Sequence, residues 1–553
     1  MTGAPGEGTG RRSKERGAYY TDRPVADFLV RWAIRSTGDR VLDPSFGAGV
    51  FLHAAWGRLS ELGGDPHAQV QGVELDRETY RAACADLEAL GRRPGAGLVC
   101  GDFFDLEPLP RYHCVVGNPP FIRYQRFRGE VRQKALRCAA DLGVRLPALS
   151  SSWAPFLVKS AAHLVRGGRL AMVAPVELGH AAYARPVLHY LHRSFARVTF
   201  LTFREPLFPS LSEDTLLVLA ENRGDPPGDF RWIDLPGPHA LLQPRRADGL
   251  PGDPEPLETD AMLRGERRLL HHLLDADTRR LYSSLQGHPH TRRLGDLVDV
   301  GIGYVTGANE FFHLSPEKAQ RLGIDPRYLV RAVRRGKSLK GIVYTMEDWS
   351  EGLEREESGL LLRIPPGTVP TGSLARYLEE GRRTRIHLRY KCRVRQDWFA
   401  VPHVYEPRAF LTYMSGEAPR LVANQARVVA TNSLHVLRAL PGVNVNPEEL
   451  AARWGTSLTF LSAELEGHAL GGGMLKLEPG EARRVLLAVP PISPHRINAL
   501  VHLVDALVRR GDVQGAVLHA DLEFLELGLG LSREDCVRLR EGARRLRERR
   551  TRG

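Results

Sequence analysis

The chain has 553 residues, of which 42% are hydrophobic and 26% are charged, and its formal net charge at pH 7 is +12. Ordinary domains hold about 100–250 residues, so this length excludes a single small domain and predicts two or three domains with sizeable cores. The basic balance favours an anionic partner, most often nucleic acid, although arginine codon preference in a GC-rich genome would give the same excess.

Cysteine usage and hydropathy restrict the class of protein further. Six cysteines stand without a CxxC pair or metal-like spacing, namely Cys84, Cys100, Cys114, Cys138, Cys392 and Cys536. This pattern argues against a disulfide framework and a zinc site, and it suits a reducing cytoplasm. The sequence shows no secretory signal and no run near the roughly 18 apolar residues of a membrane span. We therefore expect a soluble cytoplasmic protein without a metal or a membrane partner.

The N-terminal region leads from a polar segment into a helix. Residues 1–16 are rich in Gly and charge, and we expect them to be disordered. Residues 17–21 (GAYYT) then precede an apolar-periodic segment, 25–34, that predicts a helix. Two tyrosines before a helix are usually packing residues, but a loop of small residues with a Thr can also close over a ligand.

Residues 40–52 (RVLDPSFGAGVFL) predict a short strand, a glycine loop and a helix. Gly47 and Gly49 let the backbone approach a ligand, and the helix N-terminus offers unpaired N–H groups. The dinucleotide-binding fingerprint requires Gly or Ala where Leu52 stands, so NAD binding is disfavoured. Asp43 at the strand end suits a cationic ligand group, such as an amino-acid ammonium, better than a pyrophosphate.

Two more predicted strands contain acids at their ends. Glu74 follows Gly49 by about 25 residues, and an acid at that place can accept from both ribose hydroxyls of a nucleoside. Asp102 ends the next strand, where its carboxylate can accept from an adenine amine with Phe103 against the ring. Each acid alone is more often a cap or a surface charge. All three would lie at the strand C-termini, where open α/β sheets bind ligands.

Residues 115–121 (VVGNPPF) predict a fourth buried strand that ends in a stiff turn. Pro119 and Pro120 fix φ and lack an N–H, so the loop cannot continue the strand ladder. Taken alone, this loop fits a structural turn as well as an active site. Its position after three strand-end acids favours the active site.

The remaining elements of this half continue the alternation. We expect helices and strands at 151–165, 169–175, 185–195, 198–203 and 215–220. The fold class is therefore α/β, with a doubly wound Rossmann-like sheet and an antiparallel edge strand over residues 17–225.

The pattern changes after this domain. Residues 226–289 are partly Pro/Gly/Asp-rich and predict a linker and a connecting helix, and residues 290–553 predict a mixed α+β domain. Basic tracts mixed with aromatics recur there, for example in residues 389–399 (RYKCRVRQDWF). Such tracts can grip phosphates and contact bases, although a solvated surface is the simpler interpretation of any one of them. The Arg-rich end beyond 531 predicts a basic helix that is either solvated or rests on an anion.

The motif order resembles the gamma class of adenine-N6 DNA methyltransferases. The motifs are GAYYT, DPSFGAGVFL, GVELD, GDFF, GNPPF and LFP, followed by a long basic region. In that class the cofactor motifs precede the catalytic motif, and the target-recognition domain comes last. The resemblance is looser in the C-terminal half, where GIGYVTGANEFF and GGGMLKLEPGE look like segments of recognition domains. It implies a restriction–modification or phage-defence enzyme that uses S-adenosyl-L-methionine as cosubstrate and double-stranded DNA as partner.

The resemblance also implies residue roles. It gives the catalytic role to Asn118, Pro119, Pro120 and Phe121, and stacking on the flipped adenine to Phe121 and Phe208. It also implies the residues that bind the cofactor. Tyr20 and Thr21 would cover it, and Asp43, Gly47 and Gly49 would hold its methionine portion. Glu74 would bind the ribose, Leu75, Asp102 and Phe103 would bind the adenine, and Asn118 would also contact the cofactor. Adenine N6 is a poor nucleophile, and the Asn118 side chain with the Pro119 carbonyl would hold both of its N–H groups and direct its lone pair.

Three other functions remain open from the sequence. A glutamine-N5 protein methyltransferase also uses an NPP-aromatic loop, but it usually lacks a basic region of about 250 residues. A cytosine-N4 DNA methyltransferase more often has Ser in place of Asn118. A catalytically silent DNA-binding specificity subunit would have no need of intact acids at 43, 74 and 102. We expect a monomer without a fused nuclease, which leaves a separately encoded cognate endonuclease as a candidate partner.

Overall fold

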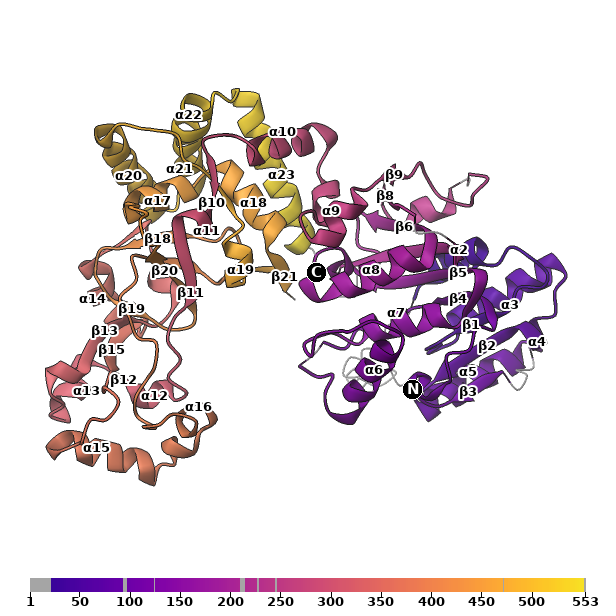
Figure 1. The fold of residues 1–553 in the computed structure, drawn as a ribbon, viewed down its shortest axis with the longest axis horizontal. Coiled ribbons are helices and arrows are strands. Elements are labelled where there is room, and N and C mark those ends of the chain that lie inside the picture. The colour runs from indigo at the N-terminus through magenta and orange to yellow at the C-terminus, as the bar shows by residue number, and fades with distance from the viewer. Residues whose placement is uncertain are drawn as a thin grey trace, which may run out of the picture. The chain divides into compact units, whose positions relative to one another are not determined.

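The computed structural model describes residues 21–92, 97–123, 125–208, 214–225, 228–243, 246–470 and 472–551. The expectations for residues 1–16 and for Tyr20 lie outside this part of the chain. The chain divides into two compact units (Figure 1): unit 1 ends at Leu273, and unit 2 is Leu274–Thr551. The catalytic and target-recognition roles of the predicted domains stay proposals.

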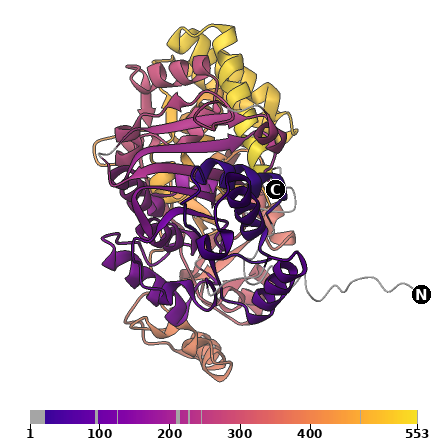
Figure 2. The same cartoon turned by 90° about the vertical axis from the view of Figure 1, so that its right-hand side faces the viewer.

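Unit 1 is built on a nine-stranded sheet whose long central strands lie side by side (Figure 2). The strand order is β3-β2-β1-β4-β5-β7-β6-β8-β9. The strands are β1 (Val41–Asp43), β2 (Val70–Glu74), β3 (Leu98–Cys100), β4 (Tyr112–Gly117), β5 (Leu164–Pro175), β6 (Phe195–Phe203), β7 (Thr215–Arg223), β8 (Phe230–Leu235) and β9 (Glu255–Pro256). This order confirms the predicted doubly wound α/β fold.

The pairing directions define the functional edge of the sheet. Strands β3, β2, β1, β4 and β5 pair in parallel, so their carboxyl ends lie at one edge. Strand β7 runs antiparallel between β5 and β6, and β8 and β9 continue the sheet beyond β6. Strand β7 is internal because it pairs with both β5 and β6, and the antiparallel edge strand is β9. Residues 226–289, expected as a linker and helix, supply β8 and β9. Burial of Phe230 and Trp232 holds β8 in the sheet.

Helices flank this sheet. The α-helices of unit 1 are α2 (Arg23–Ala33), α3 (Val50–Leu62), α4 (Pro66–Gln69), α5 (Arg77–Ala89), α6 (Gly129–Asp141), α7 (Trp153–Ala162), α8 (Arg185–Ser194) and α9 (Thr259–Arg264). The short 3-10 turns are η1 (Phe103–Asp105), η2 (Val176–Gly179), η3 (Ala182–Ala184), η4 (Pro238–Leu242) and η5 (Leu269–Leu273). Helix α7 is buried on all sides, which is the position expected of a helix without a polar face.

Unit 2 combines several small sheets with helices, as the predicted mixed α+β class requires. Among its described residues the strand orders are β10-β23, β11-β20-β16-β18-β14, β12-β15-β13-β19 and β17-β22-β21. The strands are β10 (Thr291–Arg293), β11 (Val298–Ile302), β12 (His313–Leu314), β13 (Leu329–Val333), β14 (Val343–Tyr344), β15 (Ser358–Leu362), β16 (Ala409–Thr412), β17 (Met414–Ser415), β18 (Leu421–Asn424), β19 (Val429–Ala430), β20 (Leu434–Ala439), β21 (His468–Leu470), β22 (Met474–Lys476) and β23 (Leu486–Ala488).

The helices of unit 2 gather around these sheets. They are α10 (Ala276–Gln286), α11 (Leu294–Leu297), α12 (Asn309–Phe312), α13 (Pro316–Arg321), α14 (Met346–Glu354), α15 (Gly372–Arg383), α16 (Tyr390–Arg393), α17 (Pro447–Trp454), α18 (Ser457–Glu466), α19 (Pro479–Ala482), α20 (Pro494–Arg509), α21 (Val513–Ala520), α22 (Leu527–Leu529) and α23 (Arg533–Thr551). The 3-10 turns η6 (Pro326–Tyr328), η7 (Gly336–Ser338) and η8 (Ile386–Leu388) and a π-turn, Asp521–Glu526, complete the unit.

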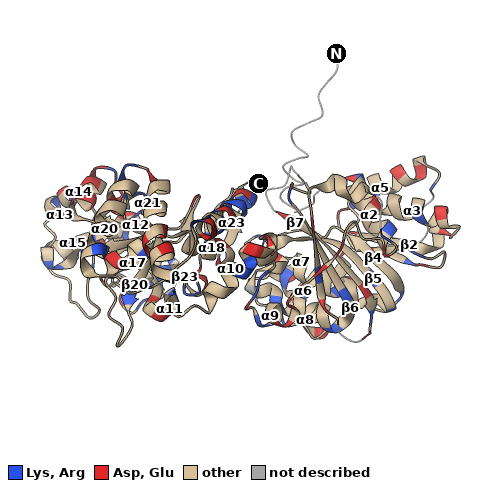
Figure 3. Cartoon of the chain, turned by 90° about the horizontal axis from the view of Figure 1, so that it is seen from above, with Lys and Arg blue, Asp and Glu red and all other residues tan. Residues whose placement is uncertain are grey.

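Helix α23 is the Arg-rich helix that the sequence predicts. Cationic and acidic residues alternate along it (Figure 3). Arg538 pairs with Asp277 at 3.0 Å, and Arg544 pairs with Glu541 and Glu548. Near its end, Arg550 reaches the buried Glu464 at 2.9 Å. These carboxylates neutralise much of the charge of α23, so the structure favours a packed helix over one that rests on an external anion.

Candidate active site

The carboxyl ends of β1, β2 and β4 bring the predicted site motifs together. In the sheet register Leu42 lies beside Val115, and Asp43 lies beside Gly72. The glycine loop after β1 and the loop 118–121 after β4 therefore leave the sheet at neighbouring positions. This is the edge at which open α/β sheets bind ligands.

Asp43 is a buried acid with one oxygen satisfied. Its Oδ1 accepts a hydrogen bond from the Ser45 N–H at 3.1 Å, whereas Oδ2 is buried without a hydrogen-bond partner in the described part of the chain. Burial raises the pKa of this carboxyl to about 8, with a smaller contribution from the charge of Glu74. A cation at this place would reverse the shift, because it stabilises the ionised carboxylate.

The glycine loop is held against the end of β2. Gly47 and Gly49 have φ angles of +52° and +83°, a region that side chains other than glycine disfavour. The Gly47 N–H donates to Glu74 Oε2 at 3.0 Å, and Glu74 Oε1 accepts from the Asp76 N–H at 2.8 Å. Glu74 therefore orients the loop as well as presenting a carboxylate at the sheet edge.

Gly117 allows the chain that leads into the loop 118–121 to pass directly beside Asp43. A Cβ atom on Gly117 would lie 2.9 Å from Asp43 Oδ1 and 3.3 Å from Pro44 Cδ, and its φ is +157°. The Ser45 hydroxyl donates to the backbone carbonyl of Asn118 at 3.4 Å. The two loops are thus joined by close packing and by a hydrogen bond.

Asn118 links the loop to the first described residue. Its Nδ2 donates to Thr21 Oγ1 at 3.1 Å, so the last residue of the GAYYT motif contacts the predicted catalytic amide. The other amide atom, Oδ1, is buried and accepts no hydrogen bond from any described residue. A buried acceptor without a donor costs about 1–3 kcal/mol, and such atoms mark places where a ligand completes the hydrogen bonding.

Ser152, immediately before α7, clamps the same loop, and the sequence interpretation did not identify it. Its hydroxyl donates to the Pro120 carbonyl and accepts from the Ile122 N–H at 2.8 Å, and its own N–H donates to the Ile122 carbonyl at 3.0 Å. A Ser before an apolar helix suggests a helix cap, but nothing local to it indicates a contact 30 residues earlier in the chain.

The aromatic residues assigned to the two ligands are all buried. Phe121 and Phe208 lie inside unit 1, and so does Phe103, whose ring stacks on that of Phe156 at a centroid distance of 5.3 Å. The buried Lys159 places its Nζ 5.1 Å from the Phe103 ring centroid. These rings support the site from within, and a base could stack on Phe121 or Phe208 only after the ring is uncovered.

Asp102 and Leu75 lie at the ends of the two outer strands. Leu75, after β2, is 69% exposed and offers an apolar surface. Asp102, after β3, accepts from the Phe104 N–H at 2.9 Å and pairs with Lys134 of α6 at 2.8 Å. Lys134 also pairs with Asp105, so the sequence interpretation missed a cation beside the predicted adenine acceptor.

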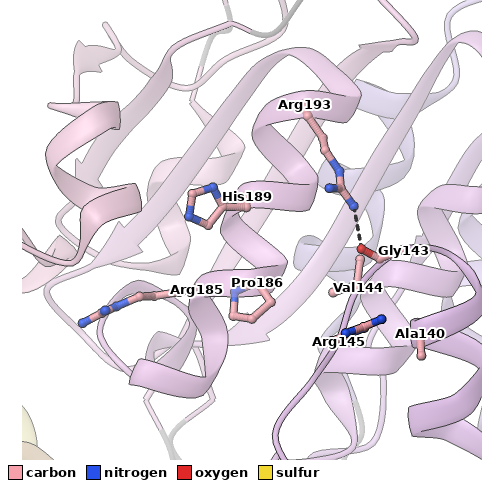
Figure 4. Close-up of a pocket in the computed structure, with 8 residues that line it drawn as sticks. All are labelled: Ala140, Gly143, Val144, Arg145, Arg185, Pro186, His189 and Arg193. Atoms are coloured by element: carbon pink, nitrogen blue, oxygen red, sulfur yellow. Dashed lines mark hydrogen bonds between the residues drawn. The ribbon is translucent and has the colours of Figure 1, made fainter.

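A separate surface pocket of about 510 Å³ lies between the end of α6 and helix α8 (Figure 4). It is lined by Ala140, Gly143, Val144, Arg145, Arg185, Pro186, His189 and Arg193. Arg193 donates to the Gly143 carbonyl at 3.0 Å and thereby ties α8 to the end of α6. None of the sequence-predicted site residues lines this pocket.

The described residues show neither a metal-binding group nor a membrane span. They contain no group of three or more His, Cys, Asp or Glu side chains that could hold a metal ion. No helix among them combines the length and apolar character needed to cross a membrane.

Known proteins resemble both halves of the chain. Residues 8–178 match the family described as N-6 DNA Methylase, and residues 266–525 match the C-terminal domain of type II methyltransferase M.Eco57I. Type II methyltransferase M.AccI of Acinetobacter calcoaceticus is 20% identical over 487 residues, which cover 86% of this chain and 85% of that protein. M.BstVI of Geobacillus stearothermophilus is 29% identical over 150 residues, which cover 21% of this chain and 27% of that protein.

Among solved structures, the type IIL restriction-modification enzyme MmeI in complex with DNA is similar with a TM-score of 0.53 at 11% identity. That likeness covers 95% of this chain and 75% of MmeI. The DrdV–DNA complex is similar with a TM-score of 0.53 at 12% identity, over 90% of this chain and 58% of that one. At these identities the likeness establishes the fold.

The sheet order, the glycine loop after β1 and the acid at the end of β2 define a Rossmann-like α/β fold joined to a C-terminal domain. The two family matches, together with M.AccI, make the class more specific. They support an adenine-N6 DNA methyltransferase of the kind found in restriction–modification systems.

Proposed function

We propose that the protein transfers the methyl group of S-adenosylmethionine to N6 of an adenine flipped out of double-stranded DNA, as a site-specific modification enzyme. The observation that carries this proposal is the buried Asn118 Oδ1, an acceptor without a donor beside a buried acid and a glycine loop. Unit 1 supplies the catalytic domain, over about residues 17–225, and the region 290–553 supplies target recognition.

The residues present fit S-adenosylmethionine. Asp43 Oδ2 is a buried carboxylate oxygen that can accept from an ammonium, and Gly47 and Gly49 leave the backbone of their loop accessible. Glu74 can accept from ribose hydroxyls, Leu75 and Asp102 can contact the adenine ring and its amine, and Thr21 covers the site next to Asn118. When bound, the cosubstrate supplies a methyl group activated by its sulfonium.

The catalytic loop would hold the target amine through two acceptors. Asn118 Oδ1 and the Pro119 carbonyl would each accept one N6–H, which withdraws the nitrogen lone pair from conjugation with the ring and directs it towards the methyl carbon. No hydrogen bond from a described residue reaches the Pro119 carbonyl, whereas Ser152 already occupies that of Pro120. Partial positive charge that develops on N6 is stabilised by these fixed dipoles, and one N6 proton then leaves to water.

Base flipping is needed because N6 of a paired adenine lies inside the duplex. Unpairing and unstacking cost a few kcal/mol, which stacking on Phe121 and Phe208 would offset in part. Both rings are buried in the free protein, so this role requires that DNA binding uncovers them.

The direct test is transfer of labelled methyl groups to unmethylated DNA, followed by mass spectrometry of the nucleosides. We expect N6-methyladenine as the labelled product. Label in N4-methylcytosine would establish the alternative base, and label in protein would establish a protein substrate. The absence of label from DNA would contradict the proposal.

A further inference from the structure

The segment 382–396 of unit 2 forms a ridge whose charge has one sign. It holds seven Lys or Arg residues and no Asp or Glu. The ridge comprises the end of α15, the turn η8 and helix α16, and it lies at one end of unit 2 beside α12 (Figure 1). On α23, in contrast, Arg538 and Arg544 pair with carboxylates of their own helix.

Three apolar side chains project from this basic ridge. Leu388 is 56% exposed, Tyr390 is 64% exposed and Val394 is 63% exposed. Exposed apolar side chains occur singly on most proteins, but three within seven residues form a patch that suits a partner. Cations lie beside the ring, because Lys391 Nζ and Arg393 Cζ are 5.5 Å and 5.7 Å from the Tyr390 centroid.

Several of the ridge cations have no protein counter-charge. Arg389 pairs with Glu310 at 2.5 Å, and Arg382 pairs with Glu379 at 3.4 Å. Arg385, Lys391 and Arg393 form no ion pair with any described carboxylate, and all three are exposed. The ridge thus keeps positive charge available for an external anion.

Buried side chains and hydrogen bonds hold the ridge in place, unlike a mobile charged loop. Ile386 and Cys392 are buried, and Arg395 donates to the Val305 and Thr306 carbonyls at 2.8 Å and 2.7 Å. At Gly307, where φ is +82°, a Cβ would lie 2.7 Å from Lys391 Cβ. The GYVTGANEFF segment is therefore the platform on which the ridge rests, and the exposed side chains are held ready for binding.

We propose that this ridge is a DNA-contact surface of the recognition unit. Arg385, Lys391 and Arg393 bind phosphates, and Tyr390, flanked by Leu388 and Val394, packs against bases or sugars in a groove. This inference rests on the proposed DNA substrate and adds the residues that grip it. Charge without carboxylates matches a polyanion, and an aromatic ring amid cations matches bases between phosphates. An acidic protein would not need the exposed ring.

The test uses full-length protein and two ridge variants. One replaces Arg385, Lys391 and Arg393 with Gln, and the other is Tyr390→Ala. A control variant, R510Q/R538Q/R544Q, removes the same charge from the residue after α20 and from α23. Binding is measured over a range of salt concentrations to duplexes of about 30 base pairs, one with the methylated sequence found for the wild type and one scrambled.

We expect the triple ridge variant to bind both duplexes at least tenfold more weakly. We also expect it to lower the salt slope of log K by up to about 2.7, since each phosphate contact contributes about 0.9. Tyr390→Ala should weaken binding about fivefold to hundredfold without changing the salt slope. The control variant should keep its salt slope within about one contact of the wild type.

Unchanged affinity and salt slope in the ridge variants, with the fold intact by circular dichroism, would overturn the inference. So would loss of binding to phosphatidylglycerol vesicles alone, because that outcome identifies a membrane surface. If the wild type methylates DNA and the ridge variants methylate it equally well at limiting enzyme, the ridge proposal fails while the proposed function stands. If the wild type neither binds nor methylates DNA, the proposed function itself fails.

Discussion

The sheet edge of unit 1 and the ridge of unit 2 are built in opposite ways. At the edge, the predicted site atoms Asp43 Oδ2 and Asn118 Oδ1 are buried and accept no hydrogen bond from any described residue. On the ridge, most of the cations are exposed to solvent, and so are three apolar side chains, Leu388, Tyr390 and Val394. The difference fits the two tasks that we propose: a reaction needs a few atoms fixed in a dry place, whereas binding a long polyanion needs surface and charge.

The contrast is tested most severely by Asn118→Ala. This change removes the orphaned acceptor, and by analogy with the loss of one fixed dipole in other active sites we expect methyl transfer to fall by about 10²–10³-fold or more. Cofactor affinity should stay within a few-fold, as measured by calorimetry. Asn498→Ala, at an exposed position on α20, should leave transfer unchanged. Full activity in Asn118→Ala would remove the distinction between the two regions.

Asp43 gives the edge a pH dependence that the ridge lacks. Its pKa of about 8 lies above the ordinary 3.8, so the free protein favours the protonated carboxyl. The free energy of unfolding that this group contributes is fully present below pH 3.8 and is lost as the pH rises from 3.8 to about 8. A cationic ligand requires the ionised form, so its affinity should increase with pH up to about 8 and its binding should release a proton.

Asp43→Asn tests whether this carboxyl causes the pH dependence of ligand affinity and the release of a proton. We expect it to weaken S-adenosylmethionine binding by about tenfold to a hundredfold, the range of a charge-assisted hydrogen bond, and to abolish the pH dependence. Calorimetry in buffers of different ionisation enthalpy would measure the proton release. Equal proton release by wild type and variant would show that Asp43 is not the titrating group.

Gly117→Ala tests the close packing of the two loops. The added methyl group would stand 2.9 Å from the Asp43 carboxylate, and we expect a loss of about 1–3 kcal/mol in the free energy of unfolding. Urea denaturation provides the measurement. Gly101→Ala is the matched control. A Cβ atom on Gly101 would lie 3.8 Å from Val99 Cγ1, and the φ of Gly101 lies outside the left-handed region that disfavours side chains.

The smallest effect is expected for Ser152→Ala. Loss of its two hydrogen bonds to the catalytic loop should lower kcat several-fold, with KM for S-adenosylmethionine unchanged, because the loop becomes less well positioned. Ser150→Ala, which removes only a local bond to the Pro147 carbonyl, should not do so. An equal loss in both variants would mean that the effect is structural.

Local patterns were enough to predict the sheet and much of the edge. Strand ends with acids, a glycine loop and a Pro-Pro turn are all encoded in short stretches, so the position of Asp43, Glu74 and Asn118 at this edge could be predicted. Strands β8 and β9 were missed because their Pro- and Gly-rich surroundings predict a loop, and β9 of two residues exists only through its pairing with β8.

Contacts between distant residues could not be predicted in the same way. Ser152 and Lys134 reach loops 30 and 32 residues earlier, and no periodicity reports such a contact. The burial of Phe121 and Phe208 was also hidden, because an aromatic residue in a motif has the same sequence signal whether it packs or stacks on a ligand.

The central claim is that Asn118 presents an acceptor to an adenine amine in DNA. Long-read sequencing of DNA from a methylation-deficient host that expresses either the wild type or Asn118→Ala tests this claim most directly. We predict N6-methyladenine at one sequence context in the wild type and unmodified DNA in the variant, with both proteins present at equal levels. The same adenine modification in both hosts would contradict the account.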